Sequence, residues 1–183
     1  MNHLLSNEFL TVEVSAHGAE LQSIRNNRTG HEYLWQGNPS FWGRRSPVLF
    51  PIVGSLWNGE YHTLGRSFKM SQHGFARDMD FTLIAESDTM LAFRLDASDS
   101  TLECFPYRFS LEISYELNET RLEVKWKVNN LSDAVMPFQI GAHPAFNYPG
   151  YSVAETLHGY FSIGHSGKDV EYELIQTLSL INL

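Results

Sequence analysis

His143 stands in a short segment whose neighbours restrict the backbone on both sides of it. Gly141 and Ala142 leave little side-chain bulk before the histidine, while Pro144 fixes its own φ and pushes His143 toward an extended conformation. A strand that ends here holds the imidazole at the end of a sheet, where rigid scaffolds commonly carry functional groups. Because imidazole titrates near neutral pH, His143 is a candidate for proton transfer. The alternative is a buried histidine that only bonds a backbone carbonyl.

Two further groups of polar residues also stand beside glycine or proline, at the expected ends of strands. They are Arg44 and Arg45 in one segment, and His73, Arg77 and Asp78 in the other. Arginine offers a fork of donors that stays charged, and histidine can donate, accept or transfer a proton. A donor-rich site with aromatic walls suits a polyhydroxyl compound, because hydroxyls need directed hydrogen bonds and the C–H face of a sugar packs on rings. The candidate walls are Trp35, Phe75, Phe146 and Tyr148.

Each of these residues also has a structural interpretation. Arg44 and Arg45 can pair with surface carboxylates, as most arginines do. For Arg77 and Asp78, a pair that locks their own loop is favoured over catalysis. His73 fits a simple turn residue before its glycine, and the aromatic residues fit a hydrophobic core except where they lie beside these loops.

The sequence lacks the motifs of other common sites. It contains no HExxH, no CxxC and no glycine-rich phosphate loop. The spacing of His143, His158 and His165 matches no compact metal site, so we expect neither a metal nor a cofactor. Cys104 is the single cysteine, which rules out an internal disulfide, and it has no basic neighbour that would make its thiol a nucleophile.

The composition, with 43% hydrophobic and 19% charged residues, is typical of a soluble protein, and residues 1–183 suit one domain or a large part of a bigger one. A formal net charge of −8 argues against a nucleic-acid binder. No apolar run has the length of a membrane span, and the N-terminus at Met1–Leu5 lacks the features of a secretion signal. Together with the single cysteine, these observations predict a cytoplasmic protein whose partner is a small molecule rather than nucleic acid or a membrane.

Alternating apolar and polar residues over 109–117 and 122–128 predict an amphipathic antiparallel hairpin whose Glu and Lys side chains pair on the solvent face. Other strands are expected at 9–14, 20–25, 32–35, 68–72, 81–85, 91–95 and 160–163. Prolines on both sides of residues 48–50 argue against a regular strand there. No long helix is indicated before residue 150, and residues 171–183 show no clear period. The chain therefore predicts an all-β sandwich.

Four segments of the chain resemble aldose 1-epimerases, in the same order, with the LacX-like branch of galactose mutarotase-related proteins as the best match. They are Gly18–Leu21, Trp42–Pro51, His73–Asp78 and Gly141–Asn147. The resemblance covers residues 18–147 and is specific because the four motifs occur together. It implies a galactose mutarotase-like β-supersandwich and an isomerase of carbohydrate metabolism that interconverts the α and β anomers of a free hexose without a cofactor.

The resemblance also assigns roles to individual residues. In the family, a histidine at the position of His143 is the general acid toward the ring oxygen, while a histidine at His73 and an arginine in the region of Arg44 and Arg45 bind the sugar. It does not say which arginine matches, and we prefer Arg45. In related hexose-6-phosphate mutarotases an arginine near Arg77 contacts phosphate, so a phosphorylated sugar stays open. The candidate catalytic residues are His143 and His73, and the candidate sugar-binding residues are Arg45, Arg44, Arg77, Asp78 and Phe146.

The chain departs from the family in its C-terminal part. Family members are substantially longer, and their general base is a glutamate in a later strand, so we expect an incomplete supersandwich that lacks this portion. Glu155, Glu171 and Glu173 follow His143, and none has the expected context. We therefore expect weak or absent anomer exchange, with a non-catalytic carbohydrate-binding domain or a structural β-domain as alternatives. A partial sandwich exposes sheet edges, which leaves room for a homo-oligomer.

Overall fold

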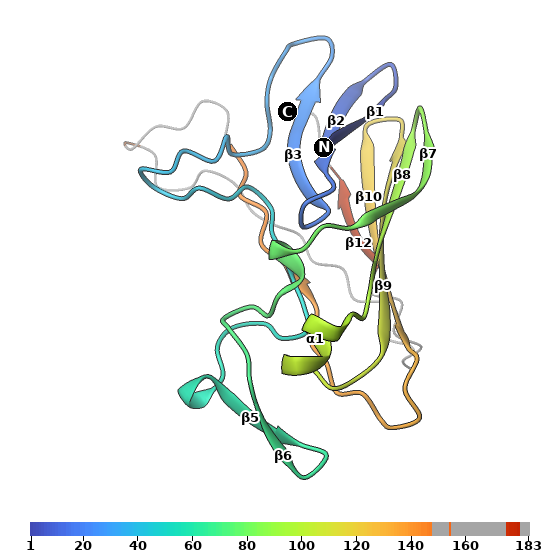
Figure 1. Cartoon of the computed structure of the whole chain (residues 1–183). Coiled ribbons are helices and arrows are strands. Elements are labelled where there is room, and N and C mark those ends of the chain that lie inside the picture. Colours follow the sequence, from blue (N-terminus) through green and yellow to red (C-terminus); the bar gives the residue numbers. More distant parts are fainter. Residues whose placement is uncertain (148–153, 155–174, 180–183) are drawn as a thin grey trace, which may run out of the picture.

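The computed structural model describes residues 1–147, 154 and 175–179. In these residues, strand is far more common than helix (Figure 1). A five-stranded antiparallel sheet has the order β12-β10-β9-β8-β7, and a three-stranded sheet has the order β1-β2-β3. Two short pairs, β11-β4 and β5-β6, complete the strands. The bounds are β1 (Asn2–Ser6), β2 (Leu10–Ser15), β3 (Glu20–Asn26), β4 (Val48–Leu49), β5 (Glu60–Thr63), β6 (Arg66–Lys69), β7 (Thr82–Ser87), β8 (Met90–Asp96), β9 (Phe109–Asn118), β10 (Arg121–Asn130), β11 (Gly141–Ala142) and β12 (Ile175–Ser179). The predicted all-β class is confirmed.

The hairpin β9–β10 is the most regular part of the fold, as its alternating sequence predicts. The odd-numbered side chains of β9 from 109 to 117 are buried, which places the apolar residues on the inner face. On the outer face, Lys127 lies opposite Glu112 with 3.7 Å between their charged atoms, and Lys125 lies 3.4 Å from Glu116. The predicted Glu–Lys pairs across the hairpin are therefore confirmed.

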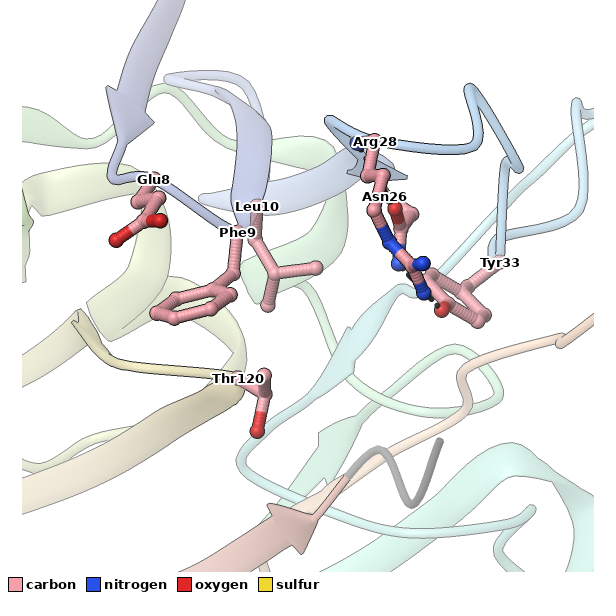
Figure 2. Close-up of a pocket in the computed structure, with 7 residues that line it drawn as sticks. All are labelled: Glu8, Phe9, Leu10, Asn26, Arg28, Tyr33 and Thr120. Atoms are coloured by element: carbon pink, nitrogen blue, oxygen red, sulfur yellow. Dashed lines mark hydrogen bonds between the residues drawn. The ribbon is translucent and has the colours of Figure 1, made fainter. Parts of the chain in front are cut away.

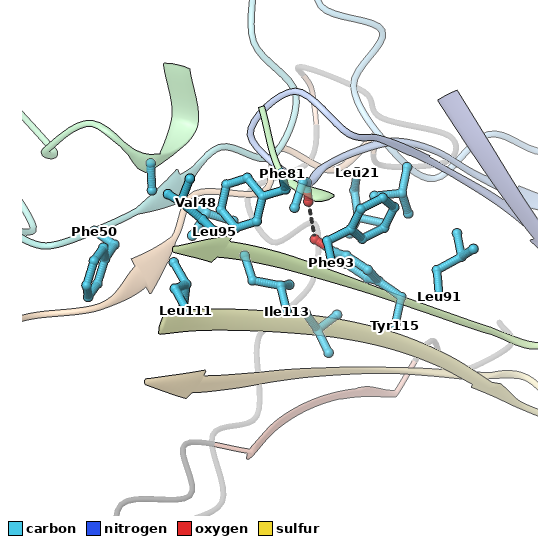
Figure 3. Packing of buried hydrophobic residues seen from close by; sticks show 14 of the residues in the cluster. Leu21, Val48, Phe50, Phe81, Leu91, Phe93, Leu95, Leu111, Ile113 and Tyr115 are labelled. Atoms are coloured by element: carbon cyan, nitrogen blue, oxygen red, sulfur yellow. Dashed lines mark hydrogen bonds between the residues drawn. The ribbon is translucent and has the colours of Figure 1, made fainter. Parts of the chain in front are cut away.

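The core fills the space between the two larger sheets (Figure 3), where β1 contacts β8 and β9. Leu91, Phe93 and Ile113 from the five-stranded sheet are completely buried and face Leu21 of β3. The hydroxyl of Tyr115 donates a hydrogen bond to the carbonyl oxygen of Ala19 at 2.6 Å, which supplies the partner that a buried phenol requires. Burial, aided by the nearby carboxylate of Glu20, raises the pKa of Tyr115 above its ordinary value.

Three short helical turns join the strands in the described part of the chain, and the sequence indicated none of them as a helix. The α-helix α1 (Asp99–Cys104) begins with a capping box. The Ser98 hydroxyl accepts a hydrogen bond from the Thr101 amide, and the Thr101 hydroxyl accepts one from the Ser98 amide. The other two are 3₁₀ turns, η1 (Trp57–Gly59) and η2 (Ala76–Asp78). Because η2 carries Arg77, its position matters for the site described below.

Several predicted strands differ from the observed ones. Residues 32–35 form only isolated bridges, because the Glu32 carboxylate itself accepts the amides of Ile24 and Leu34. The strand expected at 68–72 is β6, which begins and ends earlier, and β1 was not predicted at all. Residues 175–179, which showed no clear period, form β12 against β10. The strand expected at 160–163 lies outside the described residues.

Candidate functional site

The segment that carries His143 is hydrogen-bonded to β4 and to the residues just before it. β11 pairs with β4, and the pairing continues beyond both strands: the amide of His143 donates to the carbonyl of Pro47 at 3.1 Å, and the amide of Ala145 donates to that of Arg45 at 2.9 Å. His143 thus directly follows a strand, as predicted, although that strand has only two residues. Pro144 has no amide to donate, so the pairing can continue only through alternate residues.

The imidazole of His143 points away from the core. Ala142, Pro144 and Phe146 line an inner cavity of about 30 Å³ beneath this segment, and successive side chains of extended backbone point to opposite faces. His143 is accordingly exposed, and its ring nitrogens have no hydrogen-bond partner within the described residues. Its ring centroid lies 5.0 Å from that of Trp42, with 52° between the planes. Phe146 packs on the core side, so its role as a sugar wall stays a prediction.

Asn147 holds the far end of this segment in place. Its side-chain amide donates to the carbonyls of Glu32 and Leu34 at 3.1 Å and 2.7 Å. The amide of Trp35 in turn donates to the carbonyl of Ala145 at 2.8 Å. These bonds restrict the backbone on the C-terminal side of His143, as β4 does on the other side. The predicted wall residue Tyr148 follows at once and lies outside the described residues.

His73 occupies a tight turn that bonds to residues 50–54, the part of the chain that follows β4. It has a φ of +67°, and its amide donates to the carbonyl of Gly54 at 2.8 Å. In return, the amide of Gly54 donates to Nδ1 of His73 at 3.0 Å. Only glycine fits at position 74, because a Cβ there would lie 2.2 Å from the carbonyl oxygen of Phe50. The turn interpretation of His73 is thus correct, and the turn also fixes its ring.

The electrostatics of His73 show that three predicted site residues share one neighbourhood. Its pKa is lowered from the ordinary value by partial burial first, and then by the positive charges of Arg77 and His143. Such a shift favours the neutral imidazole at neutral pH. Arg77 and His143 therefore lie near His73, although His143 is 70 residues away in sequence.

Arg44 and Arg77 are tied to each other through Asp78. Arg44 donates from Nη2 to Oδ1 of Asp78 at 2.5 Å and from Nη1 to the carbonyl of Arg77 at 3.4 Å. Arg77 donates from Nη2 to the carbonyl of Gln72 at 2.8 Å, and its buried Nε has no hydrogen-bond partner within the described residues. Asp78 lies 3.6 Å from that Nε. This network connects Arg44 to the loop that carries His73.

Arg45 turns in a different direction. Its guanidinium donates to the carbonyl of Gln22 on β3, while its amide and that of Ser46 donate to one carboxylate oxygen of Glu20 at 2.8 Å and 2.9 Å. From the sequence we preferred Arg45 as the sugar-binding arginine. In the structure, however, it is Arg44 that contacts the loop carrying His73, through Arg77 and Asp78. Which arginine binds a sugar stays a prediction. The role of the buried Glu20 was missed, although it belongs to the first motif.

The larger of the two described cavities lies elsewhere, beside the start of β2 and the β9–β10 turn (Figure 2). It has a volume of about 310 Å³ and combines two aromatic rings with charged and polar groups. Its lining residues are Glu8, Phe9, Leu10, Asn26, Arg28, Tyr33 and Thr120. None of them was predicted as a site residue, and neither described cavity is lined by the two histidines. Of the two histidines, His143 is exposed and His73 is half-buried.

Other site types find no support among the described residues. No group of three histidine, cysteine, aspartate or glutamate side chains there is arranged to hold a metal ion. In the same part of the chain, none of the helices combines the length and the apolar character needed to cross a membrane. Burial raises the pKa of the Cys104 thiol at the end of α1, which agrees with the prediction that it is not a nucleophile.

Comparison with known proteins links these observations to one family. The family described as Aldose 1-epimerase matches residues 1–180. The chain is 39% identical over 151 residues to the chromosomal protein LacX of Lactococcus lactis subsp. lactis, a match that covers 79% of this chain and 50% of LacX. It is also similar to the crystal structure of a galactose mutarotase related enzyme from Lactobacillus acidophilus, with 40% identity, a TM-score of 0.81, and coverage of 85% of this chain and 51% of that one.

A second solved structure, of a galactose mutarotase-like protein from Lactobacillus casei, gives a similar result. Its sequence is 37% identical, the TM-score is 0.79, and the match covers 80% of this chain and 50% of that one. The identity is high enough for the likeness to reflect common ancestry as well as a shared fold. The chain spans about half the length of each of these relatives.

Proposed function

Because the chain belongs to the aldose 1-epimerase family, we propose that its two-histidine face binds a free hexose and takes part in interconverting the α and β anomers. The observation that carries the proposal is the placement of His143. Its exposed ring has nitrogens without a partner in the described residues, and the backbone beneath it is held by β4. Arg77 and His143 act electrostatically on His73, which supports our assignment of these three side chains as the groups that meet the sugar.

In this proposal, His143 transfers a proton to and from the ring oxygen of the sugar. Protonation of that oxygen weakens its bond to C1, and the bond breaks as the anomeric hydroxyl loses its proton to a base. Rotation about C1–C2 presents the other face of the aldehyde, and ring closure returns both protons. A positioned proton donor of this kind accelerates a reaction by about 10²–10⁴-fold. The neighbouring Trp42 ring limits the directions in which the imidazole can turn.

The reaction also needs a group that takes the anomeric proton. Among the described residues, Asp78 is the carboxylate whose contacts connect it to the cluster, and guanidinium groups of Arg44 and Arg77 face its two oxygens. The family resemblance puts the base in a later strand, and Glu155, Glu171 and Glu173 lie outside the described residues. Because arginines face both oxygens of Asp78, we expect slow anomer exchange if Asp78 is the base.

The test measures anomer exchange of glucose and galactose by NMR exchange spectroscopy, with and without the protein. We expect a small acceleration that His143→Gln abolishes, because glutamine cannot protonate the ring oxygen. His62→Gln is the matched control, since His62 is an exposed histidine on β5, bonded at Nδ1 to the hydroxyl of Ser67. An acceleration that survives His143→Gln and equals that of the control would contradict the assigned role.

A non-catalytic carbohydrate-binding domain is the second candidate. Among the described residues, the carboxylate connected to the two histidines is that of Asp78, and it is already engaged by two arginines. This observation favours the non-catalytic candidate. Titration of ¹⁵N-labelled protein with the same sugars separates the two functions. Saturable shifts of the His73 and His143 amides without any change in anomer exchange would support this candidate, while shifts accompanied by exchange would support the isomerase.

A further inference from the structure

Gly54 and His73 form a closed pair of hydrogen bonds that involves the histidine ring. The amide of His73 donates to the carbonyl of Gly54 at 2.8 Å, which anchors the backbone of the turn. The amide of Gly54 then donates to Nδ1 of His73 at 3.0 Å. Gly54 has a φ of +86°, a conformation that glycine adopts without strain, so its amide is held in a direction that other residues rarely permit.

The second of these bonds determines where the ring carries its proton. A backbone amide can only donate, so the nitrogen that it meets must offer a lone pair. A neutral imidazole has one nitrogen of each kind, and with Nδ1 as the acceptor the proton must reside on Nε2. We propose that the Gly54 amide locks His73 as the neutral Nε2–H tautomer, so that this histidine acts as a fixed hydrogen-bond donor to a sugar oxygen and not in proton transfer.

The groups around His73 reinforce this lock. Protonation of Nδ1 would turn two N–H donors toward each other and break the bond to Gly54. The charged groups that act on the ring are Arg77 and His143, and both lower its pKa. Together with partial burial they lower the pKa of His73, which is consistent with a ring that stays neutral when the pH falls below the usual histidine range.

The lock gives the two histidines different tasks. His143 has no hydrogen-bond partner for its ring nitrogens in the described residues and can exchange protons with a ligand. His73 offers only one N–H, in one direction, and therefore selects ligands with an acceptor oxygen at that point. This part of the inference rests on the proposed function, because it names a sugar as the ligand. The tautomer itself does not, since it is a property of the free protein.

The first test therefore uses the ¹⁵N-labelled full chain without any sugar. Long-range ¹H–¹⁵N correlation reports which ring nitrogen of His73 is protonated, and His73→Asn identifies its signals. We expect a protonated Nε2, an unprotonated Nδ1, and a ¹⁵N–¹⁵N coupling through the hydrogen bond between Nδ1 and the Gly54 amide. His62, whose Nδ1 meets a rotatable hydroxyl, serves as the comparison. A proton on Nδ1 of His73, or the absence of that coupling, would overturn the proposal even if sugar binding were confirmed.

The second test separates donation from proton transfer. His73→Asn suits the positive φ but cannot reach the position of Nε2, whereas His73→Gln can place an amide N–H there. We expect His73→Asn to weaken sugar binding about tenfold, as for one lost hydrogen bond, and His73→Gln to retain most of the affinity. Any anomer exchange should persist in His73→Gln. If both variants bind sugar normally and both lose exchange, His73 transfers protons and the proposal is wrong.

Discussion

The interior of the sandwich and the histidine face are built by different means. In the sandwich, side chains alternate between core and solvent, and long ladders join the strands, as in the ten-residue register of β9 with β10. On the histidine face, three irregular segments around residues 44–54, 72–78 and 139–147 meet through single backbone bonds and side chains that bond backbone groups. The difference shows that the histidine face, which also buries Phe50 and Ala76, depends in addition on specific polar contacts.

The start of β3 connects the two regions. Gly18 lies so close to the η2 turn that a Cβ there would be 2.8 Å from the carbonyl oxygen of Arg77. The carbonyl oxygen of Ala19 accepts a hydrogen bond from the hydroxyl of Tyr115 in the core. Glu20 is buried, and its carboxylate accepts hydrogen bonds from the amides of Arg45 and Ser46, which lie at the start of the segment 44–54 of the histidine face. A motif without an obvious chemical role thus positions the residues that have one.

The largest effect is expected in the core of the sandwich. Phe93 is fully buried and lies 6.5 Å from the ring of Tyr115, so Phe93→Ala removes a large side chain and leaves a cavity. We expect the free energy of unfolding to fall by about 3–5 kcal/mol, measured by chemical denaturation. Leu4→Ala, at a side chain that is 61% exposed, should change it by no more than about 0.5 kcal/mol. If the molecules that remain folded bind sugar less tightly, the two regions are not independent.

A smaller loss of stability with a larger loss of ligand binding is expected for Glu20→Ala. The substitution leaves the amides of Arg45 and Ser46 without their acceptor, at a cost of about 1–3 kcal/mol for each buried group. Because the segment 44–54 would then move, sugar affinity measured by NMR titration should also fall. Glu20→Gln keeps an acceptor oxygen and is the matched variant. Unchanged affinity in Glu20→Ala would show that Glu20 does not connect the regions.

The pH dependence of the histidine face provides a third prediction. The pKa of His73 is lower in the folded protein than the ordinary value of 6.5, so the unfolded chain binds more protons as the pH falls. The contribution of this group to stability is therefore complete above about pH 6.5 and is lost as the pH falls toward the folded pKa. Arg77→Gln removes one of the causes and should raise the pKa of His73 in an NMR titration. A pKa that does not rise would exclude Arg77 as a cause.

The sequence predicted most of the sandwich because alternation records which face of a strand is buried. The hairpin β9–β10 follows this pattern closely, and β8 does too, whereas the pairing of β7 with β8 shifts register between Leu83 and Ala85. It fails at residues 32–35, where the Glu32 side chain takes the amides that a neighbouring strand would use. It also fails for β12, whose composition gives no period although it pairs with β10.

The histidine face was predicted less completely. The types of its residues and the motifs that contain them indicated His73, His143 and the arginines. The direction of each side chain was not predictable, because it depends on contacts across 20 or more residues, such as those of Arg45 with Gln22 and Arg44 with Asp78. Trp42 was not singled out as a site residue, although it opens the Trp42–Pro51 motif and stands next to Gly43-Arg44.

The smallest effect is expected for the solvent-facing ion pair between Lys127 and Glu112. Both charges lie on the outer face of the sandwich, 3.7 Å apart, where water screens them and two flexible side chains lose freedom to meet. A double-mutant cycle with Lys127→Met and Glu112→Gln should give a coupling energy of about 0.2–1 kcal/mol that decreases with added salt. The same cycle with Arg44→Met and Asp78→Asn should give a larger coupling that depends less on salt, because Arg44 is partly buried and also bonds the carbonyl of Arg77. Equal couplings for the two pairs would mean that polar contacts contribute no more to the histidine face than to the surface of the sandwich.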